Sequence, residues 1–395
     1  MRHFWPSLAT VLVVAFTLTA CTSDDEAASQ DSDRESDRAA LSSVVATYAD
    51  IVFASYQDSY DAAVELDQAV DAFIAAPTDA SLQAAQNAWR AAREPYGQTE
   101  AYRFANGPID DADGPEGYLN AWPLDEAYID YVVGDPDAGV INRTDQFPTI
   151  DADLLISLNE AGGEENISIG YHAIEFLLWG QDLSETTAGT RPVTDFTTAA
   201  NADRRKAYLG VVSDVLLVHL GEMVDAWDPN GSGNYRDTFL GLEPEQALRN
   251  ILTGIGTLSK SELAVERIFV PVNNQDQEDE HSCFSDNTHR DMITNAQGIA
   301  NVWQGRYTRT DGSVVEGASL SELVGASDTD LATIINGNVT TALSAVEAIP
   351  VPFDQSIIHN QEVVISSVDA LQELGDSFVQ GAQAIGLAIN TELPD

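Results

Sequence analysis

Apolar residues recur along most of this chain at the spacing of an amphipathic helix. Between residues 41 and 75 they fall three or four positions apart, and the same spacing returns over 81–104, 197–227 and 244–270. Further helices are predicted over 291–305, 320–326, 328–348 and 356–391. No stretch alternates convincingly between apolar and polar residues, as a half-buried strand would. The pattern therefore predicts an all-α protein.

Proline, glycine and aspartate mark the places where helices should end. Pro95 should kink or break the second helix, and residues 105–120 are dense enough in Gly, Pro and Asp to predict an acidic loop. The run Asp-Pro-Asn-Gly-Ser-Gly at 228–233 is the strongest boundary between domains. The simplest architecture is two helical bundles joined there, an N-terminal domain over 41–230 and a C-terminal domain over 231–395.

The N-terminus has the anatomy of a bacterial signal segment. A short basic start precedes an apolar run over 8–18, which is too short to span a bilayer as a permanent helix. The sequence Leu-Thr-Ala-Cys at 18–21 resembles a lipobox, which implies a signal peptide over 1–20 and lipid attachment to Cys21. Because Thr22 follows the cysteine, delivery to an outer membrane is favoured. The alternative is an ordinary secreted protein with a chance cysteine.

Acidic residues dominate the composition. Residues 21–40 are acidic and poor in apolar side chains, so they predict a disordered, solvated tether. Over the whole chain 64 Asp and Glu stand against 18 Lys and Arg, a formal net charge of -46. Such a surface argues against nucleic acid as a partner, since phosphate contacts need basic side chains. It suits a surface adapted to salty water or one that concentrates cations near a metal site.

One short run carries the clearest candidate chemistry. Residues 170–175, Gly-Tyr-His-Ala-Ile-Glu, head an apolar stretch, and His172 and Glu175 are spaced to share one helix face and reach one cation. Gly170 permits close approach of another backbone. The pair is neither the HExxH motif of zincins nor its inverted form, because Phe176 stands where a second His would be. Taken alone, the pair also fits a histidine satisfied within the core.

A second segment, around Pro95, combines acids with arginines. Glu94 and Glu100 flank the proline, with Arg93 and Arg103 close by. This arrangement predicts either a salt-bridge ladder on a helix surface or a cleft into which Glu100 projects as a metal ligand, held by an arginine.

A third segment, residues 277–291, holds two His, one Cys and several acids. That density is typical either of a metal-binding loop or of turn formers in an acidic chain. Just before it, Glu262 and Glu266 are one helical turn apart. If Cys21 is lipidated, Cys283 has no partner within the chain, so no internal disulfide holds the fold together.

These runs together resemble the imelysin family, also classed as peptidase M75, and in particular its iron-regulated protein A branch. Residues 170–175 match the GxHxxE signature of that family. The other blocks that carry the resemblance are 89–110, 121–126, 176–182 and 278–289. The resemblance covers most of residues 41–390.

The resemblance implies two helical bundles related as a duplication, with the functional cleft at their interface and His172 and Glu175 at its centre. It implies a bound metal ion, with iron favoured and zinc as an alternative, because imidazole and carboxylate ligands do not decide between them. To this pair we add Glu100 as a third ligand. The residues expected to support the cleft are Gly170, Arg93, Asp110, Glu262, Glu266, His281, Cys283, Asp286 and His289.

The sequence therefore predicts an envelope lipoprotein that binds a metal ion and takes part in iron acquisition. It would be lipid-anchored in a bacterial outer membrane, facing the periplasm or the cell surface. Its partners would be a metal ion or iron complex, the membrane through Cys21, and components of iron uptake. The alternatives are a metal-dependent peptidase of the M75 type, and a non-catalytic module that binds a polymer or haem in the interdomain cleft.

Overall fold

The computed structural model describes residues 23–110 and 114–393, so the predicted signal segment and Cys21 lie outside the described residues. The chain divides into an N-terminal unit, which ends at Ala39, and a compact unit from Ala40 onward. Helix α1 (Ser23–Ala75) begins where the sequence predicts a tether. Its Ala, Glu and Arg content is compatible with a helix, and the side chains of residues 35–40 are exposed.

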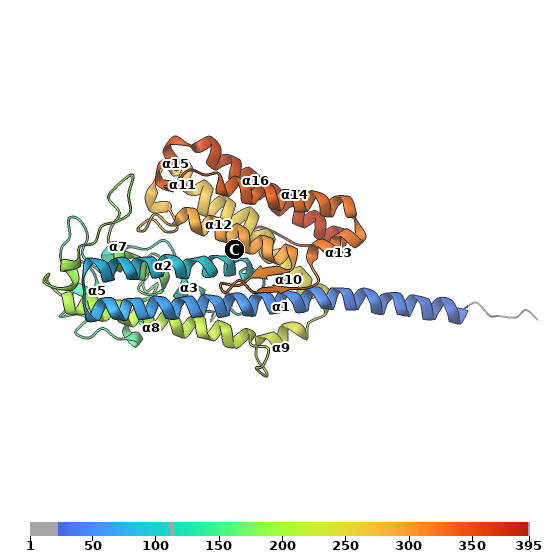
Figure 1. Ribbon diagram of the computed structural model, residues 1–395, viewed down its shortest axis with the longest axis horizontal. Helices are drawn as coiled ribbons and strands as arrows, with labels where there is room; N and C mark the ends of the chain where they lie inside the picture. The colour runs from blue at the N-terminus through green and yellow to red at the C-terminus, as the bar shows by residue number, and fades with distance from the viewer. Residues whose placement is uncertain (1–22, 111–113, 394–395) are drawn as a thin grey trace, which may run out of the picture. The chain divides into compact units, whose positions relative to one another are not determined.

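The compact unit is built almost entirely from helices (Figure 1). After α1 the chain forms α2 (Asp79–Thr99), η1 (Glu100–Tyr102), α3 (Glu116–Leu119), α4 (Glu126–Ile129), α5 (Gly139–Asn142), α6 (Ala152–Leu158), α7 (Gly170–Trp179), η2 (Val193–Phe196), α8 (Ala202–Trp227) and α9 (Tyr235–Leu240). It continues with α10 (Pro244–Thr257), η3 (Leu258–Phe269), α11 (Val270–Asn274), η4 (Gln277–Asp279), α12 (Thr288–Gln304), α13 (Leu320–Ser327), α14 (Thr329–Glu347), α15 (Phe353–His359) and α16 (Gln361–Ala384). The predicted all-α fold class is confirmed.

The long helices lie close to where the apolar spacing places them, and the differences have local causes. The predicted helix over 356–391 is broken at Asn360 into α15 and α16. Pro95 is accommodated within α2, which continues to Thr99. The sequence missed a hairpin in which β1 (Arg306–Thr308) pairs antiparallel with β2 (Val314–Glu316). Strands of three residues are too short to show alternation.

Helix packing brings distant parts of the sequence together. Helix α12 packs along α2 and also contacts α14, while α7 packs against both α2 and α8. Helix α16 packs on α14, α10 and η3. The α2–α12 contact therefore places the residues around 93 beside those around 291. The division into two domains near residue 230, and their duplication, remain predictions.

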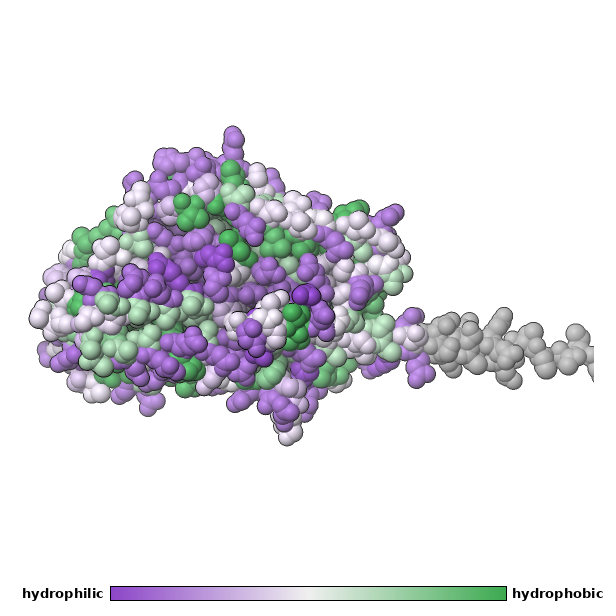
Figure 2. Space-filling model, in the orientation of Figure 1, coloured by the Kyte–Doolittle hydropathy of each residue, from purple (hydrophilic) through white to green (hydrophobic). Residues whose placement is uncertain are grey.

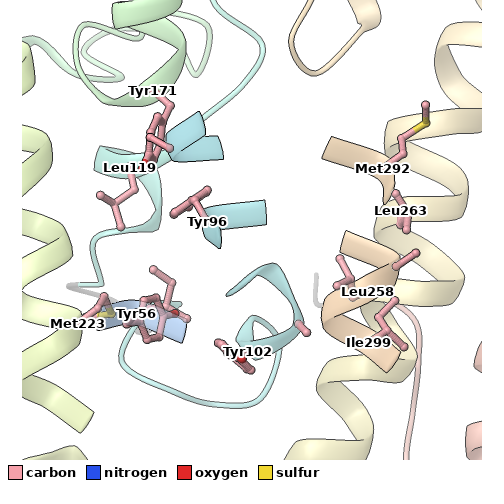
Figure 3. Packing of buried hydrophobic residues seen from close by; sticks show 14 of the residues in the cluster. Tyr56, Tyr96, Tyr102, Leu119, Tyr171, Met223, Leu258, Leu263, Met292 and Ile299 are labelled. Atoms are coloured by element: carbon pink, nitrogen blue, oxygen red, sulfur yellow. The ribbon is translucent and has the colours of Figure 1, made fainter. Parts of the chain in front are cut away.

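Aromatic and aliphatic side chains from both halves of the sequence share one continuous core. The rings of Tyr96 and Tyr171 lie 4.8 Å apart between centroids, and Figure 3 shows them beside Leu119. The same view shows Leu258 of η3 and Ile299 of α12 in the opposite part of this core. Outside the core, hydrophilic residues cover much of the face seen in Figure 2, in keeping with the net charge of -46.

Candidate metal centre

Helix α7 carries the GxHxxE run and is buried along its whole length. It begins at Gly170, whose φ of +88° is one that side-chain-bearing residues rarely adopt. A Cβ on Gly170 would stand 2.7 Å from the carbonyl oxygen of Leu119. The glycine therefore allows the start of α7 to press against the end of α3, next to Asn120.

Gly170→Ala is expected to lower the free energy of unfolding by about 2 to 4 kcal/mol, from the left-handed backbone and the contact with Leu119 combined. Gly337→Ala is the matched control, because a Cβ there meets nothing within 4 Å on the exposed face of α14. The control should be neutral or stabilising by up to about 1 kcal/mol. Chemical denaturation of both variants tests this, and equal stabilities would contradict the packing described.

His172 and Glu175 contact each other directly inside the protein. The Nδ1 of His172 lies 2.9 Å from Oε2 of Glu175, and both side chains are fully buried. The other carboxylate oxygen accepts hydrogen bonds from the backbone N–H and the hydroxyl of Ser285, at 2.9 and 2.6 Å. Burial raises the pKa of Glu175 to about 8. Both oxygens of Glu175 are therefore already engaged.

The second ring nitrogen of His172 is the outstanding feature of this site. Its Nε2 is buried and has no hydrogen-bond partner. Burial, assisted by the neighbouring His281, lowers the pKa of His172 well below 6.5, so the imidazole is neutral at physiological pH. When Glu175 is ionised, Nδ1–H donates to it, and Nε2 then carries a lone pair that nothing in the described structure uses.

A second histidine stands against the first. The rings of His172 and His281 are 4.7 Å apart between centroids and nearly perpendicular. His281 Nδ1 lies 3.3 Å from Oδ2 of Asp291, and its Nε2 lies 3.3 Å from the amide nitrogen of Asn120. Burial and the charge of Arg267 lower the pKa of His281 to about 4. This imidazole is also neutral, with Asn120 donating to its Nε2.

Arg93 occupies the interior beside this pair. It forms a salt bridge to Asp291 at 3.1 Å, and the side chains of both residues are 2% exposed. It also donates to Oδ1 of Asn120. Burial opposes ionisation of Asp291, but Arg93 and His281 hold its pKa well below the usual range. Arg93 thus orients a carboxylate, that of Asp291, and fixes the Asn120 side chain.

Glu100 reaches the centre through Asn120. The Asn120 amide nitrogen donates to Oε1 of Glu100 at 3.3 Å, the same nitrogen that faces His281. The other oxygen of Glu100 pairs with Arg267 at 2.6 Å and Arg103 at 3.4 Å. Although burial opposes ionisation, these arginines lower the pKa of Glu100 to about 2.

A long π-helix, η3, supplies part of this network. Glu262 and Arg267 are five residues apart on η3, and their side chains form an ion pair at 2.9 Å. The i→i+5 hydrogen bonding of a π-helix brings residues five apart onto the same face. Arg103 lies 3.6 Å from Glu262 and 3.2 Å from the exposed Asp110. Helical segments of this kind are frequent at functional sites.

The structure gathers some of the residues singled out in the sequence and separates others. His172, Glu175, Arg93, His281 and Glu100 belong to one cluster, joined by hydrogen bonds and by the edge-to-face contact of the two histidine rings. The other predicted residues lie outside this cluster. Asp110 pairs with Arg103, Glu262 pairs with Arg267, and Glu266 lies at the surface. Cys283 is a buried free thiol, and Asp286 and His289 line a separate pocket.

That separate pocket has a volume of about 580 Å³ and is also lined by Arg90 and Arg290. Burial and nearby Glu278 raise the pKa of Cys283, so its sulfur is a protonated thiol. Across the described ranges, 23–110 and 114–393, no three His, Cys, Asp or Glu side chains converge closely enough to enclose a metal ion as they stand.

Sequence reasoning missed five residues that complete the cluster: Asn120, Arg267, Ser282, Ser285 and Asp291. Ser282, Ser285 and Asp291 lie in the segment 277–291, so the histidines and acids of that segment were a usable signal. Asn120 and Arg267 are single polar residues with no local pattern, and only the tertiary fold brings them to Glu100.

The family model for imelysin (peptidase M75) matches residues 52–378, most of the chain. The chain belongs to the imelysin family. One relative, iron-regulated protein A of Synechococcus elongatus, is 27% identical over 338 residues, which are 83% of this chain and 82% of the relative.

Two solved structures share the imelysin fold with this chain. A protein described as an iron-regulated protein A precursor from Parabacteroides distasonis superposes with a TM-score of 0.70 at 21% identity, covering 88% of this chain and 95% of its own. An imelysin-like protein from Psychrobacter arcticum superposes with a TM-score of 0.63 at 14% identity, covering 90% and 97%. At these identities the similarity establishes the fold.

Proposed function

We propose that this imelysin binds a transition-metal ion, iron foremost, through Nε2 of His172, and that it serves iron acquisition. The proposal rests on the state of this nitrogen. It is buried, it belongs to a neutral imidazole, and it has no hydrogen-bond partner. Leaving a buried polar atom unpaired costs about 1 to 3 kcal/mol, so such atoms call for a ligand. The other ring nitrogen of His172 contacts the carboxyl group of Glu175, and metal-binding histidines almost always donate that N–H to a carboxylate, a backbone carbonyl or water.

In this proposal Glu175 orients His172 rather than binding the metal itself. Its Oε2 contacts His172 and its Oε1 accepts two hydrogen bonds from Ser285, so neither oxygen is free. A carboxylate in this position fixes the tautomer of the imidazole and raises its basicity as a ligand.

Further ligands would come from His281 and Glu100. Both contact the amide nitrogen of Asn120, which lies 3.3 Å from His281 Nε2 and 3.3 Å from Glu100 Oε1. Rotation of the Asn120 side chain would release one lone pair on each. Imidazole with carboxylate suits iron, manganese or zinc, and the protonated thiol of Cys283 adds nothing to favour a sulfur-rich site.

The setting is inferred from the N-terminus and from the family. The imelysin family and the name of the Synechococcus relative support an iron-related role. The signal-like segment and the lipobox resemblance at Cys21 support an envelope lipoprotein. The word "precursor" for the Parabacteroides protein is consistent with export. We therefore place the protein at the bacterial cell envelope.

Titration of the purified protein with Fe²⁺ under anaerobic conditions tests this function. One equivalent should bind, with an affinity that rises up to about tenfold per pH unit between about pH 6 and pH 8 and then levels off. The reason is that burial raises the pKa of Glu175 to about 8, and binding of a cation favours loss of that proton. Calorimetry in two buffers measures the proton released. Failure to bind any Fe²⁺, Mn²⁺ or Zn²⁺ would contradict the function.

A further inference from the structure

A pocket of about 480 Å³ opens beside the candidate centre, and its lining is unusually acidic. Six carboxylates face it, from α3, the loop after α6, η3 and η4: Glu116, Glu160, Glu164, Glu262, Glu266 and Asp279. Its lining also includes Asn120, Trp122 and His281, and we call this part the inner end of the pocket because Asn120 and His281 are buried. A larger pocket of about 1000 Å³ shares Glu116 and Glu160 with it and adds further acids. The surface that leads inward is therefore negative over a wide area.

The positive charges of this lining are already paired. The two arginines of the pocket are Arg103 and Arg267. Arg267 is paired with Glu100 and Glu262, and Arg103 with Glu100, Asp110, Glu116 and Glu262. In contrast, Glu160, Glu164 and Glu266 form no ion pair with any residue that the structure describes, and all three are exposed. The pocket thus offers free carboxylates and no free guanidinium.

The inner end of the pocket touches the proposed ligands. His281 lines the pocket, and its ring contacts that of His172 at 4.7 Å. Trp122 also lines it, with its ring centroid 5.0 Å from that of His172. Both rings contact that of His172, whose side chain is fully buried and whose Nε2 has no partner. The acidic lining and the unused nitrogen are two independent features that both favour a cation.

We propose that this acidic pocket is the entry to the metal centre, and that the protein accepts its metal as a hydrated cation and rejects anionic metal chelates. The inference rests on the proposed function, because it specifies the substrate class of the same site. A concave surface of one sign focuses the electrostatic field and raises the local concentration of opposite charge. A complex carrying several carboxylates would meet like charges with no free arginine to bind it.

The test compares two triple variants of equal charge. The pocket variant is Glu160→Gln/Glu164→Gln/Glu266→Gln. The control is Glu245→Gln/Glu362→Gln/Glu373→Gln, which neutralises three exposed glutamates on α10 and α16 that line neither acidic pocket. Stopped-flow mixing with Fe²⁺, followed by tryptophan fluorescence, gives the binding rate at about 20 mM and about 500 mM salt, where screening differs strongly.

At low salt the pocket variant should bind Fe²⁺ about tenfold more slowly than the wild type, and the control less than about twofold more slowly. At high salt the three rates should converge. The pocket variant should also take metal from ferric citrate, an anionic chelate, faster than the wild type. Equal slowing in both variants, or an unchanged rate in the pocket variant, would overturn the entry route. In either case, binding of one equivalent of Fe²⁺ at equilibrium would leave the proposed function standing. Absence of Fe²⁺ binding in the wild type would overturn both the proposed function and the entry route.

Discussion

His172→Ala is expected to lose more than about a hundredfold in affinity for Fe²⁺, because it removes the one buried imidazole nitrogen of the cluster that has no partner. His281 cannot compensate for the loss of this nitrogen, because its own Nε2 is already a ligand in the proposed site and its Nδ1 contacts Asp291. Calorimetry or competition with a fluorescent chelator measures the loss, and circular dichroism verifies that the variant is folded.

The chain contains a matched control for this substitution. His219 on α8 also has a glutamate three residues later, with Nδ1 2.9 Å from Oε2 of Glu222 and an unpartnered, buried Nε2. However, the side chain of Glu222 is 55% exposed and the ring neighbour is Tyr118 rather than a second histidine. His219→Ala should therefore bind Fe²⁺ within about twofold of the wild type. Equal losses in the two variants would mean that the cluster around His172 has no special role.

Arg93→Ala is expected to lower the free energy of unfolding by about 3 to 5 kcal/mol, because it leaves the ionised Asp291 buried without its partner. The guanidinium also lies over the rings of Trp89, Tyr96 and Tyr171, at 5.1–5.6 Å, and those contacts would be lost. Urea denaturation measures the change.

Arg290→Ala controls for the loss of an arginine as such. Arg290 forms a two-pronged contact with Glu94, but these side chains are 38% and 42% exposed, so the expected loss is below about 1 kcal/mol. Adding Asp291→Ala to Arg93→Ala should recover part of the stability, since the unpaired charge is removed as well. A loss below about 1 kcal/mol for Arg93→Ala alone would contradict the buried pair.

The helical fold follows from the sequence because its signal is local and repeated. The segments with amphipathic spacing, 41–75 and 244–270, are helical in the structure, as the end of α1 and as α10 with η3. The π-helical geometry of η3 had no such signal, because 12 residues are too few for apolar spacing to separate a helix with i→i+5 hydrogen bonds from an α-helix. The three-residue strands of the hairpin were too short to show an alternation of apolar and polar residues.

The candidate site was predictable only in part, for a similar reason. The spacing of His172 and Glu175 placed both on one helix face, and their mutual contact confirms the shared face. The same spacing gave no way to foresee that Ser285 would engage Glu175, or that Asn120 would stand between His281 and Glu100. Ser285 and Glu175 are 110 residues apart and Asn120 and His281 are 161 apart, so only helix packing decides those two contacts. Asn120 and Glu100 are 20 residues apart, but the irregular loop between them shows no periodic signal. The duplication, the metal and the envelope anchor remain predictions.

The most direct test of the account is a crystal of the protein soaked in Fe²⁺ and measured at the iron absorption edge. We predict one anomalous difference peak, about 2.0 to 2.2 Å from Nε2 of His172, with the Asn120 amide rotated away from His281 and Glu100. A fully occupied peak elsewhere, with His172 Nε2 still unpartnered, would contradict the central claim that this nitrogen exists to bind a metal.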